Sequence, residues 1–122
     1  MQITHIHHSS IIIANTKQSL DFYCGILKLP IDETRPDLGY PGAWLQVGEH
    51  QIHLLELPNP DPIDGRPAHG GRDRHIALGV RDYEGLVDIL EKNNIPFTAS
   101  RSGRKALFCR DPDGNALEFI GE

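Results

Sequence analysis

Four side chains that are able to bind a divalent metal ion stand at two pairs of related positions in the sequence: His8, His53, His75 and Glu118. His8 lies 45 residues before His53. His75 lies 43 residues before Glu118. Imidazole nitrogens and a carboxylate oxygen are ligands of borderline divalent ions such as Zn, Ni, Co, Mn or Fe. The sequence therefore predicts a divalent-metal site with positions left open for water or a substrate.

The alternation of side chains along a strand predicts where two of these residues point. His53 and Glu118 each lie between two apolar residues of a strand-like segment. The apolar neighbours suit a face covered by a helix, which places His53 and Glu118 on the opposite, concave face. A buried unpaired carboxylate is costly, so Glu118 requires a cation or a hydrogen-bond donor. His7 is the alternative to His8, because a register shift of one residue exchanges their faces.

The elements that would position these side chains occur twice along the chain. Each half begins with a segment rich in β-branched and apolar residues, at Ile3–Ala14 and at His75–Val80, and such segments predict strands. Amphipathic segments follow at Thr16–Lys28 and Tyr83–Lys92 and predict helices. The order and spacing of these elements indicate a diverged internal repeat.

Local signals mark the ends of the predicted helices. Asn15 and Asp82 are good N-cap residues directly before the two amphipathic segments. Pro30 and Pro96 follow the segments and are expected to stop the helices.

A predicted hairpin completes each half. Ala43–Val47, a turn and Ile52–Leu54 correspond to Ala106–Arg110, a turn and Leu117–Phe119. Each half is therefore expected to form a βαβββ module of the α+β class. We predict a single domain with module one at about residues 1–57, a connector at 58–74 and module two at 75–122.

The composition limits the classes of partner. The formal net charge of −5 gives no electrostatic case for nucleic acid, and no apolar run approaches the ~20 residues needed to cross a bilayer. The polar N-terminus does not resemble a secretory signal. Cys24 and Cys109 lie far apart without CxxC spacing, and we expect both to be reduced thiols of a cytoplasmic protein.

Three motifs, together with His8 at the start of the first strand, resemble those of the vicinal oxygen chelate superfamily. This is the family of glyoxalases, bleomycin resistance proteins and extradiol dioxygenases. The motifs are Ser19–Tyr23, Arg74–Leu78 and Asp111–Phe119. The resemblance covers nearly the whole chain. It implies two βαβββ modules that form an incomplete mixed β-barrel with flanking helices, and a homodimer is expected.

The resemblance also implies one divalent metal ion, bound by His8, His53, His75 and Glu118. It implies a lyase or isomerase whose small oxygenated substrate is chelated through neighbouring oxygens, with Glu118 moving a proton and His53 as a second base. A typical glyoxalase carries Glu where this chain has His53. One alternative is an Fe(II) extradiol-type dioxygenase that uses His8, His75 and Glu118. Another is a metal-free drug- or ligand-binding protein of the bleomycin-resistance type.

Basic residues gather around the connector and the late hairpin, and they favour a substrate with an anionic group. They are Arg66, Arg72, Arg74, Arg101, Arg104 and Lys105.

Overall fold

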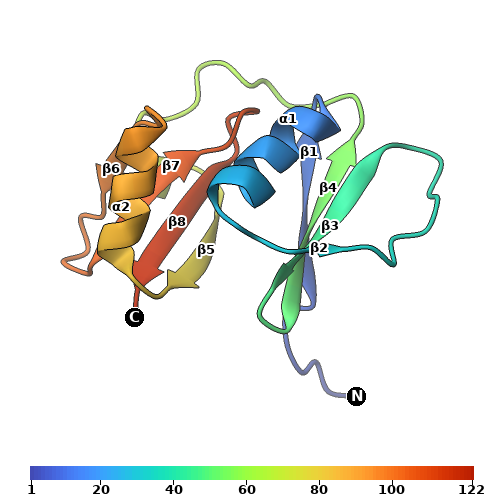
Figure 1. Ribbon diagram of the computed structural model, residues 1–122, viewed down its shortest axis with the longest axis horizontal. Helices are drawn as coiled ribbons and strands as arrows, with labels where there is room; N and C mark the ends of the chain where they lie inside the picture. The colour runs from blue at the N-terminus through green and yellow to red at the C-terminus, as the bar shows by residue number, and fades with distance from the viewer. The chain divides into compact units, whose positions relative to one another are not determined.

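The computed structural model describes residues 1–122, which divide into two compact units, Met1–Asp61 and Pro62–Glu122 (Figure 1). The first unit consists of β1 (His8–Ile13), α1 (Thr16–Leu20) with its π-helical continuation η1 (Asp21–Ile26), β2 (Ile31–Asp32), β3 (Gly42–Val47) and β4 (His50–Glu56). The second consists of a 3₁₀ turn η2 (Gly70–Arg72), β5 (His75–Val80), α2 (Tyr83–Lys92), β6 (Phe97–Ala99), β7 (Ala106–Arg110) and β8 (Ala116–Gly121). The predicted α+β class and the two βαβββ modules are confirmed. None of the helices has the length and apolar character required to cross a bilayer.

Both units have the same sheet topology. The strand order is β1-β4-β3-β2 in the first unit and β5-β8-β7-β6 in the second. In each unit the first strand pairs in parallel with the last, and the remaining pairs are antiparallel. The first strand is therefore an edge strand of its own sheet, and within that sheet it pairs only with the last strand.

The apolar residues that flank the predicted site residues lie in the core. Ile52 and Leu54 are 2% and 1% exposed, and Leu117 is fully buried. Because side chains alternate along a strand, His53 and Glu118 lie on the other face of their sheets, as the sequence predicts.

Both helical segments begin where the N-cap residues predict. The Asn15 side chain accepts a hydrogen bond from the Gln18 N–H at 2.9 Å, and the Asp82 side chain accepts one from the Gly85 N–H at 3.1 Å. Each cap satisfies one of the donors that the first helical turn leaves unpaired.

The helical segments end at Ile26 and Lys92, each four residues before Pro30 or Pro96. Lys28 (φ 62°) and Asn94 (φ 55°) adopt the left-handed conformation just after the last helical turn. A left-handed residue at this position reverses the chain and lets the following N–H groups cap the final carbonyls. The prolines then lie beyond a helix end that has already formed.

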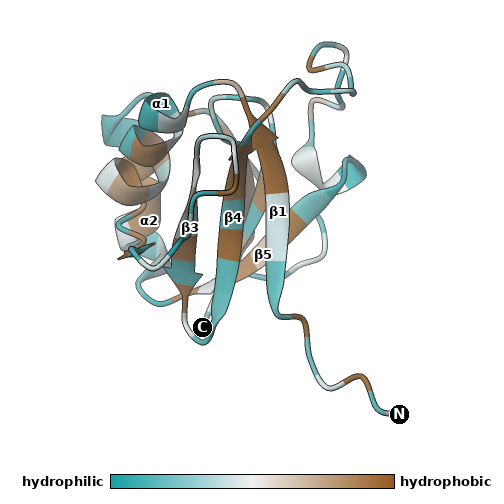
Figure 2. Cartoon of the chain, turned by 90° about the vertical axis from the view of Figure 1, so that its right-hand side faces the viewer, coloured by the Kyte–Doolittle hydropathy of each residue, from teal (hydrophilic) through white to brown (hydrophobic).

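The first strand is shorter than the sequence predicts, because it begins at His8 and not at Ile3. Its partner β4 begins at His50, so the residues before His8 have almost nothing to pair with; one bond joins the Gln51 N–H to the His7 carbonyl at 3.3 Å. Figure 2 shows that β1 is polar at its start and apolar at its end.

The motif that begins at Asp111 shapes the loop between β7 and β8. The carboxylate of Asp111 is buried and accepts hydrogen bonds from the N–H groups of Asp113 and Asn115, both at 2.9 Å. The loop therefore has a fixed conformation, and it sets where β8 begins.

We predict that Cys109 does not react with thiol reagents in the folded protein. Burial, together with the charge of Asp111, raises the pKa of the Cys109 thiol from 9.0 to about 12. A raised thiol pKa means that this group stabilises the fold below about pH 9 and loses that contribution as the pH rises. In a Cys24→Ser variant, labelling with a chromogenic disulfide at pH 8 should be complete in guanidinium and absent in native buffer. Rapid labelling of the native variant would contradict the buried position.

Candidate metal centre

In the first unit the pairing of β1 with β4 brings His8 and His53 into contact. Ser10 is the register partner of His53, so His8 lies two residues earlier on the same face. The two imidazole rings stack with centroids 4.0 Å apart and planes 15° apart. Trp44 on β3 is opposite His53, and its ring stacks on the other side at 4.6 Å. The result is a three-ring stack across neighbouring strands.

One nitrogen of each imidazole in this stack is already hydrogen-bonded. His53 Nε2 lies 2.8 Å from Gln51 Oε1, and His8 Nδ1 lies 2.9 Å from His7 Nδ1. Burial lowers the pKa of His53, and the neighbouring His8 and His7 lower that pKa further. His53 is therefore neutral at pH 7, which both a metal ligand and a base require. Nδ1 of His53 and Nε2 of His8 are the nitrogens left for an ion.

In the second unit the pairing of β5 with β8 produces the same relation between His75 and Glu118. Ala77 is the register partner of Glu118, and His75 lies two residues earlier on the same face. His75 Nε2 lies 3.2 Å from Glu118 Oε2. The register thus gives the pair His75 and Glu118 the same placement as the pair in the first unit.

The surroundings of this second pair fit a cation. Glu118 is only 4% exposed, and Arg104 Nη2 lies 3.3 Å from its Oε1. The Nδ1 of His75 lies 2.9 Å from the carbonyl oxygen of Asp73, which can only accept, so Nδ1 carries the hydrogen. The lone pair on Nε2 then faces a carboxylate oxygen at 3.2 Å. Two acceptors at this distance need a proton or a metal ion between them.

Each unit therefore brings two of the four predicted ligands together. Within neither unit do three or more His, Cys, Asp or Glu side chains form a group that would hold an ion. The convergence of all four side chains stays a prediction.

Two aromatic residues occupy equivalent places beside the pairs. Trp44 is opposite His53, and Phe108 is opposite Glu118. The Phe108 ring meets the His75 ring edge-on at 5.1 Å. The alignment of the two halves by sequence missed this equivalence. It matched Ala43 with Ala106, which places Trp44 opposite Leu107, one residue before Phe108.

Three of the basic residues proposed to attract an anion already have acidic partners. Arg104 pairs with Glu118, Arg66 with Asp73 at 2.8 Å, and Lys105 with Glu84. These partners reduce the positive charge that this region offers to a substrate.

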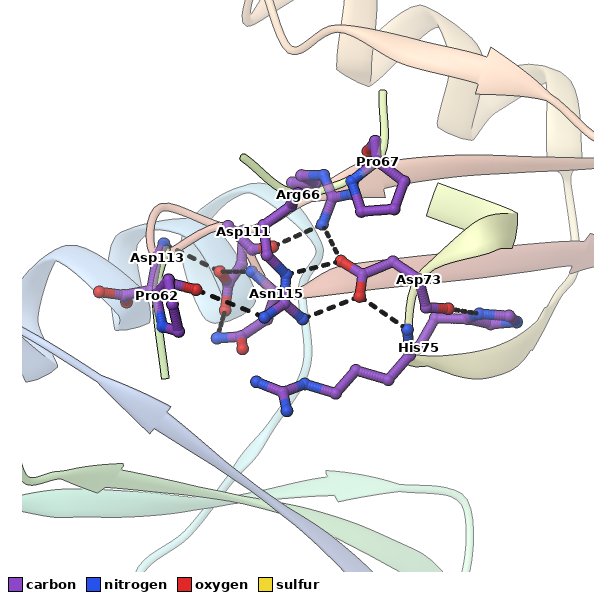
Figure 3. Close-up of polar contacts among 11 residues, drawn as sticks. Pro62, Arg66, Pro67, Asp73, His75, Asp111, Asp113 and Asn115 are labelled. Atoms are coloured by element: carbon purple, nitrogen blue, oxygen red, sulfur yellow. Dashed lines mark hydrogen bonds and ion pairs between the residues drawn. The ribbon is translucent and has the colours of Figure 1, made fainter. Parts of the chain in front are cut away.

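A polar cluster that the sequence did not reveal surrounds Asp73 (Figure 3). Arg110 belongs to this cluster and donates to Asp73. Asp73 is the second-last residue of the connector and lies two residues before His75, and Arg110 ends β7 just before the loop that begins at Asp111. The cluster joins segments about 37 residues apart in the chain, so no local sequence pattern predicts it.

The two βαβββ units are those of the vicinal oxygen chelate fold. The model of the Glyoxalase/Bleomycin resistance protein/Dioxygenase superfamily matches residues 5–119, and the chain belongs to this superfamily. A curated relative, "Glyoxylase I 4" of Arabidopsis thaliana, is 30% identical over 126 residues, which cover 98% of this chain and 71% of that protein.

Solved structures share the fold. A putative glyoxalase family protein from Bacillus anthracis aligns with a TM-score of 0.81 and 20% identity, covering 100% of this chain and 98% of that one. The fosfomycin resistance protein FosX from Listeria monocytogenes aligns with a TM-score of 0.78 and 13% identity, covering 98% and 91%. At these identities the likeness establishes the fold and leaves the activity to be argued from the site.

We predict that Arg104→Met destabilises the metal-free protein by about 1 kcal/mol, because Glu118 loses a charged hydrogen-bond donor. Urea unfolding in the presence of EDTA measures the change. The stabilisation by added metal should be larger in this variant, because the ion then neutralises a carboxylate that has lost its Arg. Arg101→Met is the matched control, since this arginine lies in the same loop and its side chain is exposed. Equal stability of the two variants would show that the Arg104 contact contributes nothing.

Proposed function

We propose that this chain is a divalent-metal-dependent, glyoxalase-like enzyme of the lyase or isomerase type. Its ligands would be His8, His53, His75 and Glu118, and its substrate a small molecule that binds through two neighbouring oxygens. The observation that carries the proposal is the contact between His75 Nε2 and Glu118 Oε2 at 3.2 Å, in which two acceptors face each other. Either a proton on Nε2 or a metal ion satisfies both atoms, and these donor types suit Zn, Ni, Co, Mn or Fe.

When bound, the ion supplies Lewis-acid stabilisation of negative charge that develops on a substrate oxygen. Glu118 would move the proton at its carboxylate, because its burial excludes bulk water and strengthens its interactions. Arg104 holds Oε1 of this carboxylate, so Oε2 is the atom directed toward His75. A substrate proton would therefore be exchanged on the Oε2 side.

His53 is the second candidate base. Its lowered pKa keeps the imidazole neutral near pH 7, so it is able to accept a proton. The ring is held between His8 and Trp44, which limits its rotation and fixes the direction in which it acts.

A metal-content experiment tests the proposal. We expect untagged parent protein to carry about one divalent ion per site by mass spectrometry, and Glu118→Gln to lose it. Ions at 100 times their dissociation constant should stabilise the parent by about 2.7 kcal/mol, so EDTA should lower the melting temperature. Glu49→Gln, an exposed turn residue, is the control and should bind like the parent. No bound metal after incubation with Zn, Ni, Co, Mn and Fe(II) would favour a ligand-binding protein of the bleomycin-resistance type.

A second candidate function is an Fe(II) extradiol-type dioxygenase. His53 Nε2 donates a hydrogen bond to Gln51 Oε1. If His53 stays outside the coordination sphere, His8, His75 and Glu118 would form a two-His, one-carboxylate set. Oxygen consumption with Fe(II) and a catechol would support this function. Turnover with Zn or Ni and no oxygen uptake would support the lyase or isomerase.

We also infer a cytoplasmic homodimer whose substrate carries an anionic group. Two free thiols agree with a reducing compartment. Light scattering on purified protein measures the oligomeric state.

A further inference from the structure

The imidazole of His75 is held by the backbone of the connector. Its Nδ1 donates to the carbonyl oxygen of Asp73 at 2.9 Å. The hydrogen on Nδ1 leaves the lone pair on Nε2, the nitrogen that faces Glu118. The peptide group between Asp73 and Arg74 thus selects which nitrogen of the ring is free.

The side chain of Asp73 fixes the orientation of this same peptide group. Asp73 Oδ1 accepts a hydrogen bond from the Arg74 N–H at 2.8 Å. That N–H and the carbonyl that receives His75 belong to one planar unit. A carboxylate that holds the N–H therefore also sets the direction of the carbonyl oxygen.

Two arginines hold the carboxylate of Asp73 (Figure 3). Arg66 donates from Nε to Oδ2 at 2.9 Å and from Nη2 to Oδ1 at 2.8 Å. Arg110 donates from Nη1 to Oδ2 at 2.8 Å. The Asp73 side chain is only 9% exposed. Paired, charge-assisted bonds that are largely shielded from water fix geometry as well as contribute energy.

Arg110 also links the connector to the strands of the site. It donates to the carbonyl oxygens of Gly114 at 2.7 Å and Pro67 at 2.6 Å. Gly114 lies in the loop before β8, the strand that carries Glu118. The start of β5 and the start of β8 are thereby held to the same side chain.

We propose that Asp73 is the positioning residue for His75, and that the clamp around it keeps the ring hydrogen on Nδ1, so that Nε2 is the nitrogen directed at Glu118. The clamp consists of Arg66 and Arg110. This inference rests on the proposed function in one respect: the orientation of the ring serves metal binding, because a histidine ligand needs a ring nitrogen without a hydrogen. The ring orientation itself is a property of the metal-free chain, so it is measurable whether or not the proposed function holds.

Loss of the Asp73 carboxylate should change the tautomer of His75. In EDTA-treated protein at pH 8, long-range ¹H–¹⁵N spectra should show the Nδ1–H form in the parent. The Asp73→Ala variant should show a mixture enriched in the Nε2–H form. A His75→Gln variant assigns the signal among the seven histidines. Zn²⁺ affinity, measured by calorimetry, should fall about 10- to 100-fold in Asp73→Ala.

Asp64→Ala is the matched control, because this exposed connector carboxylate lies outside the clamp. It should leave the tautomer and the Zn²⁺ affinity unchanged. Arg66→Met removes two donors of the clamp and keeps Asp73. It should raise the share of the Nε2–H tautomer and lower the Zn²⁺ affinity, each by less than Asp73→Ala does. It decides the question if Asp73→Ala does not fold.

A folded Asp73→Ala or Arg66→Met protein with the tautomer of the parent would overturn the inference, even with weakened Zn²⁺ binding. A parent that binds no Zn²⁺ would count against the proposed function alone, while the tautomer comparison would still decide the role of Asp73.

Discussion

In each unit the first strand pairs in parallel with the last, and the register of this pairing decides which side chains meet. His75 reaches Glu118 because it lies two residues before the partner of Glu118, and His8 has the same relation to His53. A shift of one residue would turn each first-strand histidine to the opposite face. The chemistry of both pairs depends on this pairing register of the backbone.

The burial of Glu118 imposes the second constraint. An ionised carboxylate in this position must be neutralised, and the groups around it are Arg104 and the imidazole of His75. The connector controls that imidazole through the backbone of Asp73. The connector is therefore part of the site, although its own sequence is dominated by proline, glycine and charged residues.

The two units share a topology and differ in their chemistry. The first unit presents two imidazoles stacked on Trp44, and the second presents an imidazole against a carboxylate. A duplicated fold can thus place different kinds of side chain at equivalent positions. Such a difference would allow one side chain to bind an ion and another to move a proton. The name of the superfamily joins glyoxalases, bleomycin resistance proteins and dioxygenases, so the fold alone does not decide the function.

The sequence by itself determined the order of elements, the two helix starts, the faces of His53 and Glu118, and the equivalence of the two halves. These features follow from side-chain periodicity and capping, which act over a few residues. Tertiary structure alone decided the start of β1, since a strand extends only as far as its partner. The tertiary structure also decided that Trp44 and Phe108 occupy equivalent positions, and that Arg66 and Arg110 bind Asp73. Those depend on groups far apart in the chain, and only the folded register brings them within hydrogen-bond reach.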